Sequence, residues 1–215
     1  GANGAGKTTL VKLLCGFYYP TEGNIKLNGH EISEYNIEAY YSLISAVFQD
    51  IYLLPVTIAE FVSSSENEID REKVTDVISQ AGLEDKVKAL PNGIDSKLMK
   101  GVFDDSIEMS GGENQKLMLA RALIHDPKIL ILDEPTAALD PIAENKLYLK
   151  YSELTANKTS VYISHRLAST RFCDRIIYLE NGRIVECGTH DELMKLGGKY
   201  AYMFDVQSHY YKENV

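Results

Sequence analysis

The sequence contains little cysteine and no long apolar run. Its three cysteines, Cys15, Cys173 and Cys187, lie far apart and form no Cys-x-x-Cys pair. This spacing argues against a disulfide framework or a zinc site and favours thiols in a reducing compartment. No run approaches 18 consecutive apolar residues and no signal peptide is visible, so we expect this stretch of chain to be soluble.

Positive charge is also scarce. The chain has 22 Lys and Arg against 31 Asp and Glu, which gives a net charge of -9. Nucleic-acid binding relies on clustered Lys and Arg, so this balance argues against nucleic acid as a partner. There are no repeats or low-complexity tracts. With 215 residues, 45% of them hydrophobic, the chain is able to bury the core of one large domain.

The first eight residues form a phosphate-binding motif. Gly1-Ala2-Asn3-Gly4-Ala5-Gly6-Lys7-Thr8 fits G-x-x-x-x-G-K-S/T, the Walker A loop, in which backbone N–H groups, a lysine and a hydroxyl hold a polyphosphate. Residues 8–15 predict a helix closed by Gly16, whose N-terminus favours an anion. The alternative is a glycine turn before a core helix. Because the chain begins inside the motif, we expect its preceding strand to lie upstream of Gly1.

The pattern along the chain predicts alternating strands and helices. Residues 23–29 alternate as in a half-exposed strand, residues 43–48 are apolar enough for a strand buried on both faces, and residues 51–125 are mostly helical. Strand 129–132, a helix from Pro141 to about Leu154 and strand 160–164 indicate a parallel sheet. Residues 175–179 and 183–187 predict a hairpin with its turn at Asn181-Gly182. Residues 209–215 resemble a polar tail.

Polar residues follow three of the predicted strands: Gln49, then Asp133 and Glu134, then His165. In an open α/β sheet, ligands bind beyond the carboxyl ends of the strands, where the phosphate loop also lies. Thr8 and Asp133 are the expected magnesium ligands. Glu134 is placed to polarise a water, and His165 to donate to γ-phosphate oxygens. Taken singly, each residue has an alternative explanation as an ordinary polar strand end.

A second glycine-rich helix start lies at Ser110-Gly111-Gly112-Glu113. It is suited to an anion because the N-terminus of a helix presents N–H groups. The alternative is a capping box between Ser110 and Glu113, which explains these two residues but leaves the two glycines between them unexplained.

With these motifs in this order, together with Ala138-Leu139-Asp140, the chain resembles an ATP-binding cassette (ABC) ATPase domain over nearly its whole length. The resemblance implies an α/β fold: a P-loop NTPase (RecA-like) core with a mostly parallel sheet, a small antiparallel β subdomain and an inserted helical subdomain. We expect one domain over residues 1–215 that lacks its N-terminal strands, with the core in residues 1–50 and 126–215 and the helical subdomain in residues 51–125.

The resemblance also implies a role for each motif residue. Lys7 holds the β- and γ-phosphates, Glu134 is the general base, His165 contacts the γ-phosphate and Gln49 reaches the metal and the attacking water. The metal ligands are then Thr8, Gln49 and Asp133. The implied ATP contacts are Gly1, Ala2, Asn3, Gly4, Ala5, Gly6, Lys7, Thr8, Thr9, Gln49, Ser110, Gly111, Gly112, Glu113, Asp140 and His165.

The implied cofactors are ATP and Mg²⁺, and the implied partner is a second nucleotide-binding domain in a head-to-tail homo- or heterodimer. There, Ser110, Gly111 and Gly112 complete the other protomer's site, and Asp140 lies in the loop that crosses to it. Residues 56–60, Ser164-His165-Arg166 and residues 181–194 look most like exporters whose membrane domain is fused upstream. This places the chain on the cytoplasmic side of the cell membrane. The Asp133-Glu134-Pro135 segment is compatible with importers too.

The chain departs from the family pattern at two positions. Met109 and Glu113 stand where members typically have Leu and Gln, and the carboxylate of Glu113 is expected near the nucleotide. The aromatic residue that stacks on adenine in this family would lie upstream of Gly1. Two other functions remain open: a non-transport ABC ATPase, and a P-loop phosphotransferase that passes the γ-phosphate to a substrate.

Overall fold

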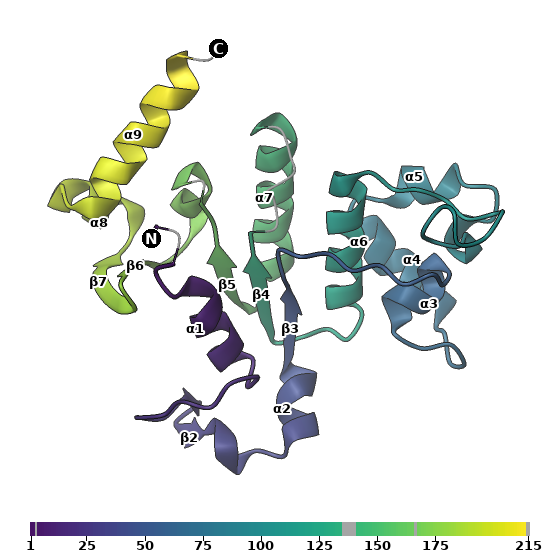
Figure 1. Cartoon of the computed structure of the whole chain (residues 1–215), viewed down its shortest axis with the longest axis horizontal. Helices are drawn as coiled ribbons and strands as arrows, with labels where there is room; N and C mark the ends of the chain where they lie inside the picture. The colour runs from purple at the N-terminus through teal and green to yellow at the C-terminus, as the bar shows by residue number, and fades with distance from the viewer. Residues whose placement is uncertain (3, 135–140, 166, 214–215) are drawn as a thin grey trace. The chain divides into compact units, whose positions relative to one another are not determined.

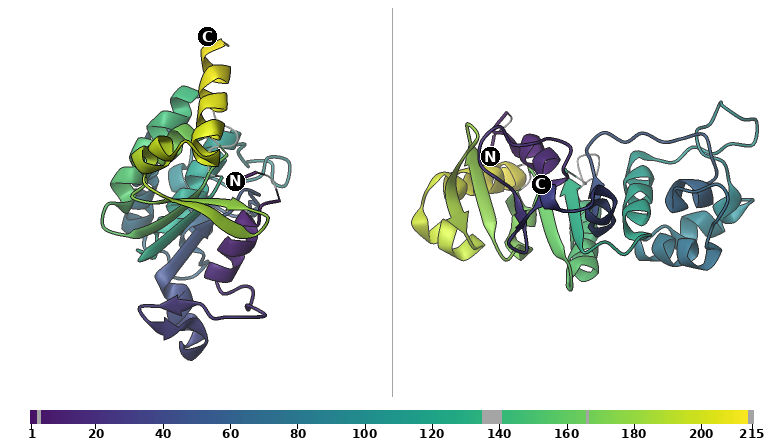
Figure 2. Two further views of the ribbon diagram at one scale, coloured as in Figure 1. Left: turned by 90° about the vertical axis from the view of Figure 1, so that its left-hand side faces the viewer. Right: turned by 90° about the horizontal axis from the view of Figure 1, so that it is seen from below.

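The computed structural model describes residues 1–2, 4–134, 141–165 and 167–213. The backbone divides into two units, Gly1–Tyr35 with Tyr162–Val215 and Asn36–Val161. Figure 1 shows the course of the chain, and Figure 2 gives two more views. The predicted α/β fold is confirmed, with a sheet containing a parallel strand pair, two small antiparallel sheets and a group of helices.

The first unit begins with the phosphate loop and α1 (Lys7–Leu14), which ends before Gly16 as predicted. Strand β1 (Lys26–Leu27) is shorter than the predicted strand over residues 23–29. Asn28 and Gly29 both have positive φ, 51° and 89°. They form the turn that leads into antiparallel β2 (His30–Glu31) and η1 (Ile32–Glu34).

The rest of this unit is a hairpin covered by helices. Strands β6 (Ile176–Glu180) and β7 (Arg183–Gly188) pair antiparallel, and the turn residues Asn181 and Gly182 have φ of 49° and 71°. The predicted hairpin is therefore confirmed. Then follow α8 (His190–Leu196) and α9 (Lys199–Glu213), so the expected polar tail is helical as far as Glu213. A core cluster joins the hairpin to these helices and to η3 (Leu167–Phe172).

The second unit contains the main sheet, in the order β3-β4-β5. Strands β3 (Ile44–Val47) and β4 (Ile129–Asp133) are parallel, with Val47 paired to Leu132. Residues 130–133 of β4 are buried, whereas β3 is fully buried only at Val47. Helix α2 (Ile37–Leu43) leads into β3, and α7 (Pro141–Thr155) precedes β5 (Thr159–Ile163). The boundary between the two units lies within β5.

The helices α3 (Ile58–Ser63), α4 (Arg71–Gln80), α5 (Glu84–Lys88) and α6 (Gly111–Leu123) belong to the same unit, with η2 (Gly93–Asp95) after α5. Helix α4 confirms the predicted amphipathic pattern, since the side chains that face inward are at most 3% exposed and Asp70 caps the first turn. The division of the chain at residues 51 and 125 stays a prediction.

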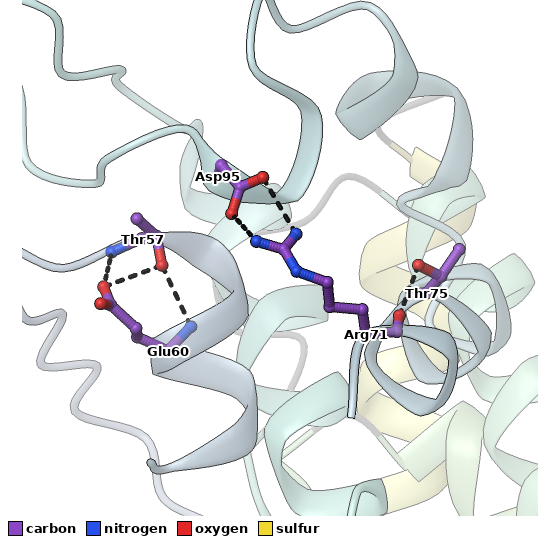
Figure 3. Close-up of polar contacts among 5 residues, drawn as sticks. All are labelled: Thr57, Glu60, Arg71, Thr75 and Asp95. Carbon is purple, nitrogen blue, oxygen red and sulfur yellow. Dashed lines mark hydrogen bonds and ion pairs between the residues drawn. The ribbon is translucent and has the colours of Figure 1, made fainter. Parts of the chain in front are cut away.

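Figure 3 shows two polar contacts in this group of helices, one at the start of α3 and one between α4 and η2. Thr57 and Glu60 form a capping box at the start of α3, a contact worth about 1 kcal/mol in many helices. Arg71 reaches from α4 to Asp95 in η2 with two hydrogen bonds, of 3.0 and 2.6 Å. This fork lowers the pKa of the Asp95 carboxyl.

Candidate functional site

The phosphate loop curls around the ammonium group of Lys7. Its Nζ donates to the backbone oxygens of Gly1, at 3.0 Å, and Ala2, at 2.9 Å. Gly4 and Gly6 have φ of 75° and 98°, a backbone conformation that glycine adopts without strain. The backbone conformation therefore explains why the motif has glycine at both positions. Asn3, one of the expected ATP contacts, lies outside the described residues.

The β6–β7 hairpin supports this loop from within the same unit. The N–H of Gly182, in the hairpin turn, donates to the backbone oxygen of Ala5 at 3.1 Å. A Cβ atom on Gly1 would lie 2.0 Å from the Leu179 backbone oxygen, so any side chain there would displace β6 or the loop. The sequence predicted the hairpin but not its contact with the loop.

Helix α1 begins at Lys7 immediately after the loop, with Gly6 at its N-cap position. The first N–H groups of any helix lack acceptors within the helix, and a glycine has no side chain with which to cap them. Thr8 and Thr9 lie in this first turn and are exposed. The turn therefore has the N–H groups and the positive end of the helix dipole that bind phosphate.

Gln49, Asp133 and Glu134 lie at one edge of the main sheet. Because β3 and β4 are parallel and Val47 is paired with Leu132, the residues that follow these two strands leave the sheet at the same edge. Gln49 is exposed, Glu134 is half-buried and Asp133 is only 3% exposed. Lys7, Thr8 and His165 belong to the other unit, and their convergence on this edge stays a prediction.

The backbone at Glu134 is left-handed, with φ of 52°. A non-glycine residue pays about 1 kcal/mol or more for this conformation, and such residues cluster at active sites. The strain occurs directly after the last residue of β4, where the chain turns out of the sheet. No sequence pattern indicates this conformation, because Asp-Glu after an apolar strand is compatible with ordinary extended backbone.

The donor atoms at this edge fit a magnesium ion. Mg²⁺ takes oxygen ligands and is usually held by one or two protein groups together with phosphate oxygens and water. The Asp133 carboxylate and the Gln49 amide oxygen are of this kind, and burial of Asp133 favours a cation beside it. Among the described residues, no cluster of three His, Cys, Asp or Glu could hold a metal alone.

The start of α6 is a capping box. The Ser110 N–H donates to Glu113 Oε2 at 2.8 Å, and the Glu113 N–H donates to Ser110 Oγ at 3.3 Å. Lys86 on α5 lies 3.1 Å from Glu113 Oε1. Burial raises the pKa of Glu113, but the bonds from Ser110 and Lys86 outweigh burial and the net pKa is lowered. The carboxylate is thus already engaged, while Gly111 and Gly112 keep the helix start without side chains.

Replacing Glu113 with glutamine is expected to change ATP turnover less than about twofold, because glutamine also completes a capping box. The loss of the charge pair with Lys86 should cost only a fraction of a kcal/mol at this partly exposed position. Steady-state phosphate release by the full-length parent protein checks this. A change of tenfold or more would mean that the carboxylate itself contacts nucleotide.

Two expected site residues remain. His165 follows β5 and is exposed, and its backbone oxygen accepts a hydrogen bond from Gln207 on α9. Asp140 lies outside the described residues. Within the residues that the structure describes, no helix is long and apolar enough to span a bilayer.

The family model described as "ABC transporter" matches residues 1–137. The ATP-dependent lipid A-core flippase of Burkholderia orbicola (strain AU 1054) is 42% identical over 207 residues, 96% of this chain and 34% of the relative. That of Cupriavidus pinatubonensis (strain JMP 134 / LMG 1197) is 39% identical over 210 residues, 96% of this chain and 35% of the relative. The chain therefore spans about a third of these relatives.

A solved structure described as a bacterial Atm1-family ABC exporter with ATP bound superposes with a TM-score of 0.86. It is 33% identical in sequence, and the match covers 96% of this chain and 36% of that one. The fold predicted from the order of the motifs agrees with this match.

Proposed function

Because this chain belongs to the ABC transporter family, we propose that it binds and hydrolyses ATP to drive export by a larger protein. One observation carries the proposal: three features occur together in this chain. They are a phosphate loop hydrogen-bonded to the β6–β7 turn, a left-handed Glu134 directly after β4, and a helix α6 that begins with two glycines. The named relatives are flippases for lipid A-core, which supports a lipid-like amphiphile as the substrate class. Export places this chain at the cytoplasmic face of a membrane.

In this mechanism Lys7 and the N–H groups of the phosphate loop bind the β- and γ-phosphates. Glu134 accepts a proton from a water, whose oxygen attacks the γ-phosphorus as ADP leaves. His165 donates to the γ-phosphate oxygens. Mg²⁺, when bound, neutralises charge on the β- and γ-oxygens. Thr8, Gln49 and Asp133 would hold it.

The site is completed by a second nucleotide-binding domain, either another copy or a homologous chain, in a head-to-tail dimer. Ser110, Gly111 and Gly112 then contact the ATP that the partner's phosphate loop holds, and Asp140 lies in the loop between the domains. Residues 51–125 act as the helical subdomain that carries the start of α6. ATP favours the closed dimer and hydrolysis releases it, which an attached membrane domain converts into motion.

The test is to reconstitute the full-length parent protein in lipid vesicles. With ATP and Mg²⁺ we expect phosphate release and movement of a fluorescently labelled lipid between leaflets, both reduced to background by Lys7→Ala. Phosphate release without lipid movement would favour a non-transport ATPase or another substrate class. Transfer of the γ-phosphate to an acceptor other than water would favour a phosphotransferase.

A further inference from the structure

One side chain of the C-terminal helix α9 forms hydrogen bonds with the backbone of both His165 and Leu167. Gln207 Nε2, on α9, donates to the His165 backbone oxygen at 2.6 Å. The Leu167 N–H donates to Gln207 Oε1 at 2.8 Å. A carboxamide carries a donor and an acceptor side by side, as the N–H and C=O of one residue do on the edge of a β-strand. Gln207 therefore acts as a short strand partner for residues 165 and 167.

Helix α9 is itself firmly attached within this unit. The Glu186 carboxylate, on β7, accepts hydrogen bonds from the Lys199 N–H at 2.6 Å and from the Tyr200 N–H at 2.9 Å, so it caps the first turn of α9. The Tyr200 ring is fully buried. Its hydroxyl bonds to Thr170 Oγ1 at 2.8 Å and to His190 Nδ1 at 2.9 Å. Gln207 therefore extends from a helix whose position is fixed by buried contacts.

The proposed role of His165 needs such a support. The residue follows the end of β5 and is exposed, and its backbone oxygen accepts the hydrogen bond from Gln207. A group that acts on a phosphoryl transition state must be held within about 0.5 Å of its productive place. We propose that Gln207 is a positioning residue that sets the backbone of His165 for contact with the γ-phosphate. This inference rests on the function proposed above.

In the full-length parent, Gln207→Ala is expected to lower kcat about tenfold and to change the KM for ATP less than about twofold. A small displacement of a catalytic group slows the chemical step more than it weakens binding. Gln207→Glu has the same shape and suits a helix, but it faces the His165 oxygen with a second acceptor, so an equal or larger loss is expected. Asp205→Ala, an exposed position on the same helix, is the matched control and should leave kcat unchanged.

A double-mutant cycle separates positioning from a general structural effect. If Gln207 acts through His165, then in a His165→Ala background the further change Gln207→Ala lowers kcat less than about twofold. A second tenfold loss in that background would overturn the proposal. So would a kcat of Gln207→Ala equal to that of the unmodified parent.

Hydrogen–deuterium exchange in the full-length parent provides a measure that does not depend on turnover. In Gln207→Ala the peptide covering residues 162–172 should exchange faster, because the Leu167 N–H loses its acceptor, whereas Asp205→Ala should leave it unchanged. Equal exchange in both variants would overturn the proposal. If the unmodified parent hydrolyses no ATP, the proposed function fails while the exchange result still decides whether Gln207 holds this segment.

Discussion

Replacing Glu134 with glutamine is expected to lower ATP hydrolysis by the full-length parent about 1000-fold while ATP still binds. Glutamine keeps the size of the side chain and its left-handed backbone position, but it cannot accept the proton of the attacking water. Removal of a general base costs about 100- to 10,000-fold in other enzymes. The measurement is phosphate release at saturating Mg·ATP, with nucleotide affinity measured separately by equilibrium binding.

Glu66→Gln is the matched control for this variant, because Glu66 is exposed after the end of α3 and has no part in the proposed site. Its turnover should equal that of the unmodified parent. If Glu134→Gln also hydrolyses ATP at the normal rate, Glu134 is not the base. A loss of ATP binding in this variant would instead mean that the carboxylate holds the nucleotide or the metal.

Local sequence patterns predicted the helices and strands that are determined by residues close together in the chain. Helix α4 follows from apolar residues at helical spacing between Asp70 and Gly82, and the β6–β7 hairpin follows from Asn181-Gly182 between two apolar segments. The predicted strand over residues 23–29 was too long. Its polar and apolar alternation continues into the turn at Asn28 and Gly29, where positive φ ends β1. Alternation alone does not mark the end of a strand.

Helix α9 was missed although part of its signal is in the sequence. Tyr200, Met203, Phe204 and Gln207 recur at helical spacing, and three of them contribute to the core of their unit. The cap of this helix, Glu186, comes from another element. Ser, Thr, Asp or Asn directly before a helix is the pattern that sequence reasoning recognises, so a cap from a distant strand stays hidden.

The same limit applies to the candidate site. The motifs supplied the residue types at the phosphate loop and the ends of β3 and β4. Three contacts of candidate-site residues join residues far apart in the chain: Lys86 with Glu113, Gly182 with the loop, and Gln207 with His165. No spacing rule connects such pairs, because tertiary packing alone brings them together.

Two variants that are each inactive are expected to regain ATP hydrolysis when they are produced together. Lys7→Ala removes the cation that holds the phosphates. Gly111→Asp places a carboxylate in the exposed first turn of α6, where it suits the helix dipole and preserves folding, yet repels the polyphosphate of the partner's site. In a head-to-tail dimer of two copies, each variant alone damages both sites.

A mixed dimer contains one Lys7→Ala chain and one Gly111→Asp chain. In it, both substitutions lie at the same one of the two ATP sites. The other site then has an intact Lys7 from one chain and an intact Gly111 from its mate. Random assembly of equal amounts makes half of the dimers mixed, so about a quarter of all sites are intact. Phosphate release by the copurified mixture should rise well above that of either variant alone. If the mixture stays inactive although both chains copurify, Lys7 and Gly111 of different copies do not share one ATP.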